Sequence, residues 1–346
     1  MPGERLALGL VHASFLTSRE KLELFSKLDN LESLTVLSIE DLCMLTGRVI
    51  KSRSWNPESL TSLVDRDQQI IERYSVRYTR VDEPLYPPLF RELYDPPFMI
   101  FWRGELPDPE QPLAAIVGTR SPTGHGAQCA TRLAAELGCQ GVPVVSGLAR
   151  GIDSCAHKGV LGTGGKTIAV LACGVERLYP RCNAPLGGRI IDSGGCVLSE
   201  YPPGDEPMAW RFPQRNRLIS GLSRSVIIVE APARSGALIT ARYALEQGRD
   251  VWVAGPCLHT VRSEGIRNLR AEGARRIDSV TELLCDWGLL REVNSMDSGI
   301  QQCNKYPVTR SCIRADHTVS AAAAVGRQMA FEFEQELELF EQHASW

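Results

Sequence analysis

Residues 146–153 read Ser-Gly-Leu-Ala-Arg-Gly-Ile-Asp and follow Val142-Pro143-Val144-Val145, a short β-branched run that is typical of a buried strand. A strand that turns through Ser-Gly into a helix presents backbone N–H groups at its tip, and the start of the helix adds partial positive charge. Arg150 adds a guanidinium suited to phosphate, and Asp153 is placed to cap the helix. The stretch predicts an anion site; an ordinary strand–helix junction with a solvated Arg150 is the alternative.

The chain has 346 residues, enough for two or three domains, and its hydrophobic fraction of 43% is typical of a soluble globular protein. No apolar run reaches the length of a membrane span, and the first twelve residues lack the cleavage site of a signal peptide. The eleven cysteines include no Cys-x-x-Cys pair, which argues against a disulfide framework and a zinc site. We expect a cytoplasmic protein with reduced, mostly buried thiols and neither a metal nor a membrane partner.

Charge is distributed unevenly along the chain. Residues 113–277 contain 20 basic and 12 acidic residues, whereas the rest of the chain contains 18 and 29. A basic middle between acidic flanks indicates a polyanionic partner for the middle segment, with an uneven surface charge of no functional meaning as the alternative.

Three segments precede the C-terminal region. Residues 1–80 predict a small helical domain, because apolar residues such as Leu24, Phe25 and Leu28 recur at helical spacing. This segment lacks the paired glycines of a helix-hairpin-helix turn, so packing alone accounts for it. Residues 81–112 are a proline-rich connector that packs on the core, with a candidate strand at residues 98–102. Residues 113–287 alternate between strands and helices.

The alternation predicts a doubly wound, mostly parallel sheet covered on both faces, which is an α/β fold. Ligands bind at the carboxyl ends of the strands in such sheets. The predicted strands are 113–117, 142–145, 166–172, 196–199, 225–229 and 251–254, and the predicted helices are 124–137, 153–161, 212–222, 237–247 and 280–287. Residues 288–346 end in an acidic stretch that alternates Phe or Leu with Glu, and no fold is assigned to them.

Four junctions in the sheet domain share one design, in which small residues stand beside a basic residue. Small residues let the backbone approach a ligand, and helix starts and basic side chains supply positive potential. The junctions are Val117–Pro122, Ser146–Asp153, Gly164–Thr167 and Ala233–Thr240, with Phe212–Arg217 beside them. We therefore expect an extended anion to bind where the guanidinium groups of Arg120, Arg150 and Arg217 meet along one edge of the sheet.

Common enzymatic motifs fail on spacing. A P-loop ending at Lys166 needs glycine at position 160, which is Val160, and a dinucleotide fingerprint from Gly124 needs glycine at position 129, which is Cys129. We therefore expect no ATP, NAD or other cofactor. His157 is predicted to pack inside a helix rather than to act as a base. Glu230 ends the central strand at the ligand edge, where it is placed to orient the arginines, and we expect a structural use rather than acid–base chemistry. Cys173 also stands at a strand end, but no paired base is identified for it.

Taken together, several motifs resemble the DprA/Smf DNA-processing family. The resemblance runs from about Pro84 to Leu284. It rests on Gly118-Thr119-Arg120, Ser146–Asp153, Ala156-His157, Phe212-Pro213-Gln214-Arg215-Asn216-Arg217, Gly221-Leu222-Ser223 and Ser235–Ala241. The loop Val253-Ala254-Gly255-Pro256 departs from the family pattern, as does Gly265-Ile266-Arg267. The winged helix that ends many members is degenerate or missing in residues 288–346.

The resemblance implies an extended Rossmann-like domain preceded by a helical, SAM-like domain. It also implies a homodimer that binds single-stranded DNA without catalysis, protects incoming DNA and loads a RecA-type recombinase during natural transformation. By match to the family motifs, Arg120, Ser146, Gly147, Arg150, Lys166, Arg215, Asn216 and Arg217 form the DNA-binding pocket. The predicted site further includes Gly118, Thr119, Gly151, Ser235, Gly236 and Thr240.

Two other functions remain open at this stage. The sheet resembles that of lysine-decarboxylase-like phosphoribohydrolases, which act on nucleotides. In those enzymes an acid closely follows the threonine after the central strand, whereas Thr240 is followed here by Ala-Arg-Tyr. A pure interaction scaffold without affinity for nucleic acid is the third possibility.

Overall fold

The computed structural model describes residues 2–52 and 55–289. A nine-stranded sheet forms its centre, with the strand order β1-β2-β6-β5-β4-β3-β7-β8-β9. The last seven strands in this order are parallel, whereas β2 pairs antiparallel with both β1 and β6. The strands are β1 (Arg77–Arg80), β2 (Met99–Gly104), β3 (Ala114–Val117), β4 (Val144–Ser146), β5 (Thr167–Val170), β6 (Cys196–Ser199), β7 (Ser225–Ile228), β8 (Asp250–Ala254) and β9 (Arg275–Ile277).

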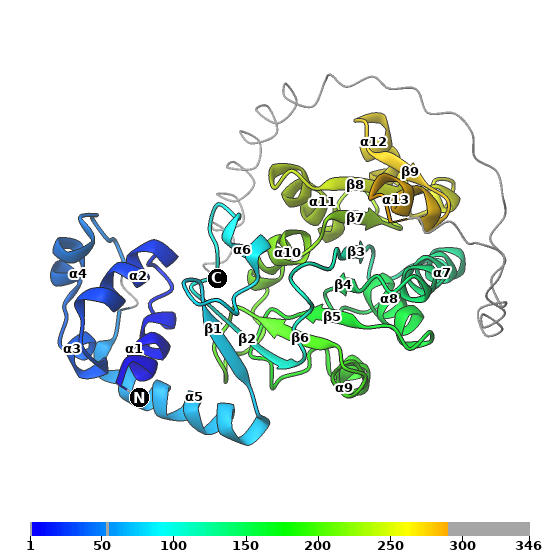
Figure 1. Ribbon diagram of the computed structural model, residues 1–346. Helices are drawn as coiled ribbons and strands as arrows, with labels where there is room; N and C mark the ends of the chain where they lie inside the picture. The colour runs from blue at the N-terminus through cyan, green and yellow to red at the C-terminus, as the bar shows by residue number, and fades with distance from the viewer. Residues whose placement is uncertain (1, 53–54, 290–346) are drawn as a thin grey trace. The chain divides into compact units, whose positions relative to one another are not determined.

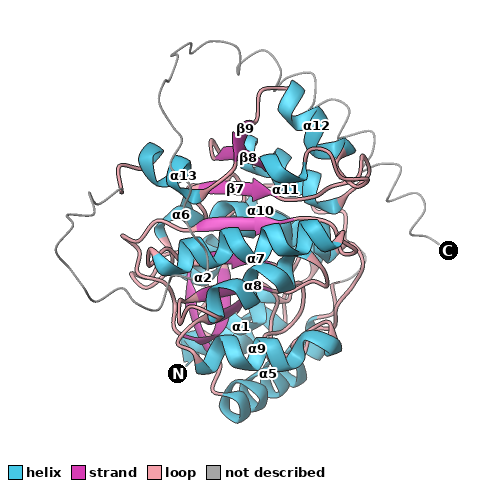
Figure 2. Ribbon diagram, turned by 90° about the vertical axis from the view of Figure 1, so that its right-hand side faces the viewer, coloured by secondary structure: helices cyan, strands magenta, loops and turns pink. Residues whose placement is uncertain are grey.

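Helices cover both faces of the sheet, which confirms the predicted doubly wound α/β class. Helices α7 (Gly124–Cys139), α8 (Ile152–Leu161) and α9 (Ala184–Asp192) lie on one face. Helices α10 (Arg211–Gly221) and α11 (Gly236–Glu246) lie on the other, behind the strands in Figure 2. The remaining elements of this part are α6 (Pro88–Arg91), α12 (Glu264–Ala271), α13 (Val280–Asp286), and the 3₁₀ turns η2 (Arg181–Asn183) and η3 (Gly255–Cys257).

The side of the sheet on which successive strands are added changes at β3. From β3 the chain adds β4, β5 and β6 on one side, and after α10 it adds β7, β8 and β9 on the other. The carboxyl ends of β3 and β7 therefore flank the topological switch point, where open α/β sheets bind ligands. We call the edge at which the seven parallel strands end the carboxyl edge, and the opposite one the amino edge.

The N-terminal segment is helical as predicted, except for its last four residues. Its helices are α1 (Pro2–Val11), α2 (Ser18–Lys27), α3 (Leu31–Thr35), α4 (Ile39–Thr46), the 3₁₀ turn η1 (Pro57–Ser59) and α5 (Leu60–Tyr74). Strand β1 follows, and it pairs with β2 from the proline-rich segment. The expectation of an all-helical segment to residue 80 is therefore wrong for residues 77–80. The proline-rich segment predicted as a connector contributes β2, which pairs antiparallel with both β1 and β6.

The hydrophobic core follows the predicted strands closely. Every residue of β3 to β7 is buried, and Trp102 and Trp252 are among the largest fully buried side chains. The helices of the N-terminal segment share one hydrophobic cluster with Phe101, Leu171 and Val197 of the sheet and its loops. Burial at about 25 cal/mol per Å² of apolar surface is the main stabilising term for such a core.

Several expectations have a different outcome or stay untested. Helices α9 and α12 and strand β9 were not predicted, whereas the other α-helices and strands after residue 113 match within a few residues. Of the eight free cysteines in the described part, four are buried, so the expectation of mostly buried thiols holds for half of them. The described residues contain no helix long and apolar enough to cross a membrane. The expectations for the C-terminal region from residue 290 lie outside the described residues.

Candidate nucleic-acid interface

Glu230, which follows β7, connects the two loops at the topological switch point through hydrogen bonds. Its backbone oxygen accepts a hydrogen bond from the Thr119 N–H at 2.7 Å, and its carboxylate accepts from the N–H and Oγ1 of Thr123 at 2.9 and 2.7 Å. Thr123 in turn caps α7 by accepting from the Gly126 N–H. A Cβ at Gly126 would lie 2.3 Å from the Glu230 carboxyl, so this helix start needs glycine. The fully buried Glu230 thus fixes the loop that carries Arg120, and among residues 2–52 and 55–289 its carboxylate bonds to Thr123 and forms no ion pair with an arginine.

Asp153 holds the loop between β4 and α8. Its carboxylate accepts from the N–H groups of Gly147 and Ala149 at 3.1 and 3.3 Å. The N-cap of α8 is Gly151 (φ 81°) rather than Asp153, so the predicted capping role is wrong. Burial raises the pKa of Asp153, while the charge of Arg215 and the two N–H groups oppose this shift. Because the carboxylate uses two N–H groups of the loop, they are not available to an external anion.

Arg215 and Ser146 belong to the interior of the site. Arg215 is only 4% exposed, and its guanidinium donates to the backbone oxygens of Gly147, at 3.0 Å, and of Val170. Burial lowers its pKa. Ser146 is fully buried, and its hydroxyl donates to the Ile116 oxygen at 2.7 Å, which ties β4 to β3. Both side chains stabilise the loop after β4 from the protein interior, and neither is exposed to an external ligand.

Arg217 does not join the other arginines. Its guanidinium pairs with the carboxylate of Glu200 and donates to the Asp95 oxygen at 3.0 Å, and its side chain is 17% exposed. The expectation that it meets Arg120 and Arg150 is therefore wrong. The neighbouring Asn216 donates to the Gly236 oxygen at 3.2 Å, so it connects α10 to the start of α11.

Lys166 lies away from the other predicted residues. It precedes β5 and therefore stands at the amino edge, where its ammonium pairs with Glu105 at 2.9 Å. The junction at Gly164–Thr167 opens a strand instead of ending one. The structure thus separates Lys166 from the site that the motif pattern predicted for it.

Two arginine-bearing loops do meet at the carboxyl edge. The Ile152 N–H donates to the Thr119 oxygen at 3.2 Å, and a Cβ at Gly151 would lie 2.4 Å from the same oxygen. Arg120 and Arg150 are both exposed on these touching loops. Within the described residues, neither forms an ion pair. The two guanidinium groups are therefore exposed to solvent on adjacent loops.

Exposed aromatic rings stand beside Arg120. Its guanidinium carbon lies 5.4 Å from the ring centroid of Phe212, and the Tyr179 ring lies 5.7 Å from that of Phe212. Tyr179 and Trp210 are 42% and 48% exposed. These rings were not among the predicted site residues, although the run Trp210-Arg211-Phe212 before Pro213 carried the signal. Large exposed rings next to cations are the composition of single-strand binding surfaces.

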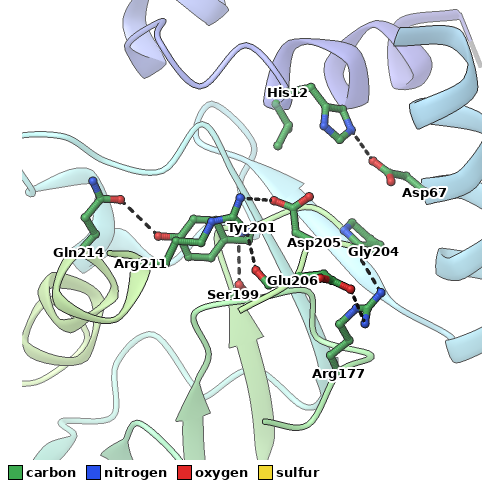
Figure 3. Close-up of polar contacts among 12 residues, drawn as sticks. His12, Asp67, Arg177, Ser199, Tyr201, Gly204, Asp205, Glu206, Arg211 and Gln214 are labelled. Carbon is green, nitrogen blue, oxygen red and sulfur yellow. Dashed lines mark hydrogen bonds and ion pairs between the residues drawn. The ribbon is translucent and has the colours of Figure 1, made fainter. Parts of the chain in front are cut away.

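Arg211 braces this aromatic surface (Figure 3). It pairs with Asp205 at 2.7 Å and lies over the Tyr201 ring, 4.4 Å from its centroid. The Tyr201 hydroxyl donates to the Gln214 side chain at 3.4 Å, and burial raises the pKa of Tyr201. The guanidinium carbon of Arg211 also lies 5.1 Å from the centroid of the Trp210 ring. Arg211 therefore contacts the exposed indole while it is paired with Asp205.

The start of α11 completes the carboxyl edge. Ser235 caps the helix by accepting from the Ala237 N–H at 3.3 Å, and Gly236 is exposed with open space around it. Arg234 is exposed on the same turn. Thr240, by contrast, is 1% exposed, so it packs inside the helix and does not face a ligand.

The groups considered for catalysis are sequestered. His157 is fully buried, its Nδ1 is bonded to the Thr167 hydroxyl at 2.7 Å, and burial lowers its pKa to about 3. The predicted packing role of His157 is confirmed. Burial raises the pKa of the Cys173 thiol to about 12, which removes a thiolate nucleophile at neutral pH. No group of His, Cys, Asp and Glu suited to a metal occurs among residues 2–52 and 55–289.

The fold and this edge define a Rossmann-like protein with a basic, aromatic-lined ligand surface, and comparisons with known proteins identify its family. Residues 77–288 match the family model described as DNA recombination-mediator protein A, and the chain belongs to this family. The match begins at the first residue of β1, which agrees with the place of β1 and β2 in the central sheet.

Individual relatives agree with this assignment. The chain is 42% identical over 225 residues to protein Smf of Synechocystis sp., which covers 64% of this chain and 56% of the relative. It is 41% identical over 202 residues to DNA processing protein DprA of Streptococcus pneumoniae, covering 58% and 71% of the two chains. The chain thus spans little more than half the length of the Synechocystis relative.

Two solved structures share the fold. The X-ray structure of DprA from Streptococcus pneumoniae superposes with a TM-score of 0.64 at 32% identity, covering 82% of this chain and 97% of that one. A structure of DNA processing protein A from Helicobacter pylori, described for its single-stranded DNA binding mode, gives a TM-score of 0.54 at 31% identity over 61% of this chain and 95% of that one. The extended Rossmann-like sheet predicted from the sequence is thereby confirmed.

Proposed function

We propose that this protein binds single-stranded DNA along the carboxyl edge of its sheet. The observation that carries the proposal is the contact between the loops of Arg120 and Arg150, which presents two guanidinium groups that no described acid neutralises. The exposed rings of Tyr179 and Trp210 lie on neighbouring loops. The Helicobacter pylori relative, described for its single-stranded DNA binding mode, supports the same ligand.

The chemistry of the edge suits a single strand better than a duplex. Phosphate contacts by arginine supply affinity that is independent of sequence and falls with salt. Aromatic rings add about 1–3 kcal/mol per stacked base, and only an unpaired base offers its face to them. Because Arg120 already lies over the Phe212 ring, a base and its phosphate can be bound by adjacent groups.

The wider role follows from the family. We propose that the protein protects incoming DNA and loads a RecA-type recombinase during natural transformation, as a cytoplasmic homodimer without catalytic turnover. The family description as a recombination mediator and the DNA-processing names of the relatives support this role. The buried, uncharged imidazole of His157 and the buried thiol of Cys173 are consistent with a binding protein.

A gel shift with an oligothymidylate, compared with a duplex of equal length, tests the proposal. We expect a shift with the single strand at a concentration that leaves the duplex free. No affinity for the single strand would overturn the proposal and favour an interaction scaffold. Release of free base from nucleoside monophosphates would instead reveal a phosphoribohydrolase; we expect none, because Thr240 is buried and Glu230 is bonded to Thr123.

A further inference from the structure

A hollow of about 420 Å³ lies between α5 and the loop that follows β5, and the interface described above does not use it. We call it the α5 hollow. Helix α5 contributes polar and apolar side chains to it, and the loop contributes two charged ones. The lining residues are Gln69, Ile70, Arg73, Tyr74, Glu176 and Arg177.

The position of α5 is set by a second arginine on the same face. Arg66 and Arg73 are seven residues apart, so they lie on one side of the helix. Arg66 donates to the Pro203 oxygen at 3.1 Å and pairs with Asp67 at 2.8 Å. Asp67 is fully buried and also bonds His12 at 2.7 Å (Figure 3). This network holds α5 against the loop after β6 and leaves Arg73 at the hollow.

Positive charge surrounds an exposed ring at the end of α5. The guanidinium carbons of Arg73 and Arg103 lie 5.5 and 5.7 Å from the ring centroid of Tyr74, which is 37% exposed. Neither arginine forms an ion pair in the described part of the chain. An exposed tyrosine between two cations repeats the composition found at Arg120 and Phe212.

The acids near the hollow are already engaged by other groups. Glu176 accepts from the Gly204 N–H at 3.0 Å and pairs with Arg177 at 3.3 Å. Arg177 also lies 3.5 Å from Glu206, as Figure 3 shows. Burial raises the pKa of Glu176, while its hydrogen bonds and the charge of Arg177 oppose this shift. The positive charge of Arg73 at the hollow, and that of Arg103 beside the Tyr74 ring, is therefore not cancelled by these acids.

One loop connects the α5 hollow to the candidate interface. Arg177 lines the hollow, and Tyr179, two residues further along, contacts Phe212 at the carboxyl edge. The Gly174 N–H donates to the Asp205 oxygen at 3.1 Å, so the loops after β5 and β6 are tied together beneath this route.

We propose that the α5 hollow is a second subsite for the same single-stranded DNA, in which Arg73 and Arg103 bind phosphates and a base stacks on Tyr74. The inference rests on the proposed function, because it extends the path of that ligand. Positively charged grooves with stacking rings are the usual construction of sequence-independent single-strand sites. The helical segment thereby acquires a role in binding that its sequence did not indicate.

Length-dependent binding tests the inference. Affinities are measured for oligothymidylates from about 4 to about 30 nucleotides, a range that brackets typical single-strand site sizes. The variants are Arg73→Glu with Arg103→Glu, and separately Tyr74→Ala. Arg270→Glu is the matched control, because Arg270 is exposed on α12, beside β8 near the other end of the sheet. We expect about tenfold weaker binding of the longest strands by both test variants, unchanged binding of the shortest strands, and little change in the control.

The outcomes separate the two proposals. Tyr74→Phe should bind like the wild type, because it keeps the stacking ring, and far-ultraviolet circular dichroism of each variant checks its fold. Wild-type binding of long strands by correctly folded variants would overturn the second subsite while the carboxyl edge still binds. An equal loss for short and long strands would also contradict it. If the wild-type protein binds no strand of any length, the proposed function itself fails.

Discussion

At the scale of single residues, the same side-chain type serves three purposes in this protein. Arg215 supports a loop from within, Arg217 is neutralised by Glu200, and Arg120 and Arg150 face solvent. The arginine-bearing motifs predicted that guanidinium groups gather at the carboxyl edge of the sheet. They did not predict which of these groups are exposed to solvent. The exposure of each arginine depends on its hydrogen-bond and ion-pair partners. These partners are distant in sequence, so a local sequence pattern does not identify them.

Arg215→Ala should therefore affect stability before it affects binding. Removing the guanidinium leaves the buried oxygens of Gly147 and Val170 without a donor and Asp153 without a nearby positive charge. We expect a loss of about 3 kcal/mol in the free energy of unfolding, the usual size for breaking a buried charge interaction. Urea denaturation measures this loss. Arg120→Ala, at an exposed position, should stay within about 0.5 kcal/mol of the wild type; equal losses for the two variants would contradict these roles.

The variant Gly126→Ala tests whether close packing against Glu230 outweighs the helix propensity of alanine at this position. Helix propensity alone favours alanine over glycine inside a helix by about 1 kcal/mol. A Cβ at position 126, however, would lie 2.3 Å from the Glu230 carboxyl. We expect a net destabilisation of about 2 kcal/mol, since the clash displaces a buried, fully bonded carboxylate. Thermal unfolding gives the sign directly, and a raised melting temperature would refute the close packing of Glu230.

At the scale of elements, the apolar runs of the parallel strands allowed most of the sheet to be predicted. Helix α9 was missed because its sequence, Ala-Pro-Leu-Gly-Gly-Arg-Ile-Ile-Asp, contains two glycines and a proline that weaken the helical signal. Strand β9 has three residues, two of them exposed arginines, and is too short to show a period. The candidate strand at residues 98–102 corresponds to β2, whereas β1 was missed because its four residues directly follow a long helical segment.

Helix α8 should make stability depend on pH through His157. Burial lowers the pKa of His157 from 6.5 to about 3, so between these values the unfolded chain binds a proton that the folded chain does not. Stability must then fall as pH decreases through this window. Relative to His157→Gln, we expect the wild type to lose about 1.4 kcal/mol more per pH unit below pH 6. Denaturant titrations at pH 7, 6 and 5 check this, and parallel curves for the two proteins would contradict a buried neutral imidazole.

At the scale of the whole molecule, the carboxyl edge gathers residues from loops that are far apart in sequence. The parallel order of β5, β4, β3 and β7 brings their following loops to one side, which the alternation of strands and helices was sufficient to predict. The same topology places Lys166 at the opposite edge, because it precedes its strand. The run Trp210-Arg211-Phe212 carried a signal for two of the rings, but the contact between Phe212 and Tyr179 could not be predicted, because the two residues come from segments that are distant in sequence.

The salt dependence of single-strand affinity tests the central claim most directly. The claim is that the guanidinium groups of Arg120 and Arg150 bind phosphates at the carboxyl edge. The measurement compares the wild-type protein, the double variant Arg120→Ala with Arg150→Ala, and Arg270→Ala on an oligothymidylate at several salt concentrations. Each phosphate contact to a single strand contributes about 0.7 to the log–log slope. We predict that the double variant loses about 1.4 of this slope and that Arg270→Ala retains it; an unchanged slope in the double variant would contradict the account.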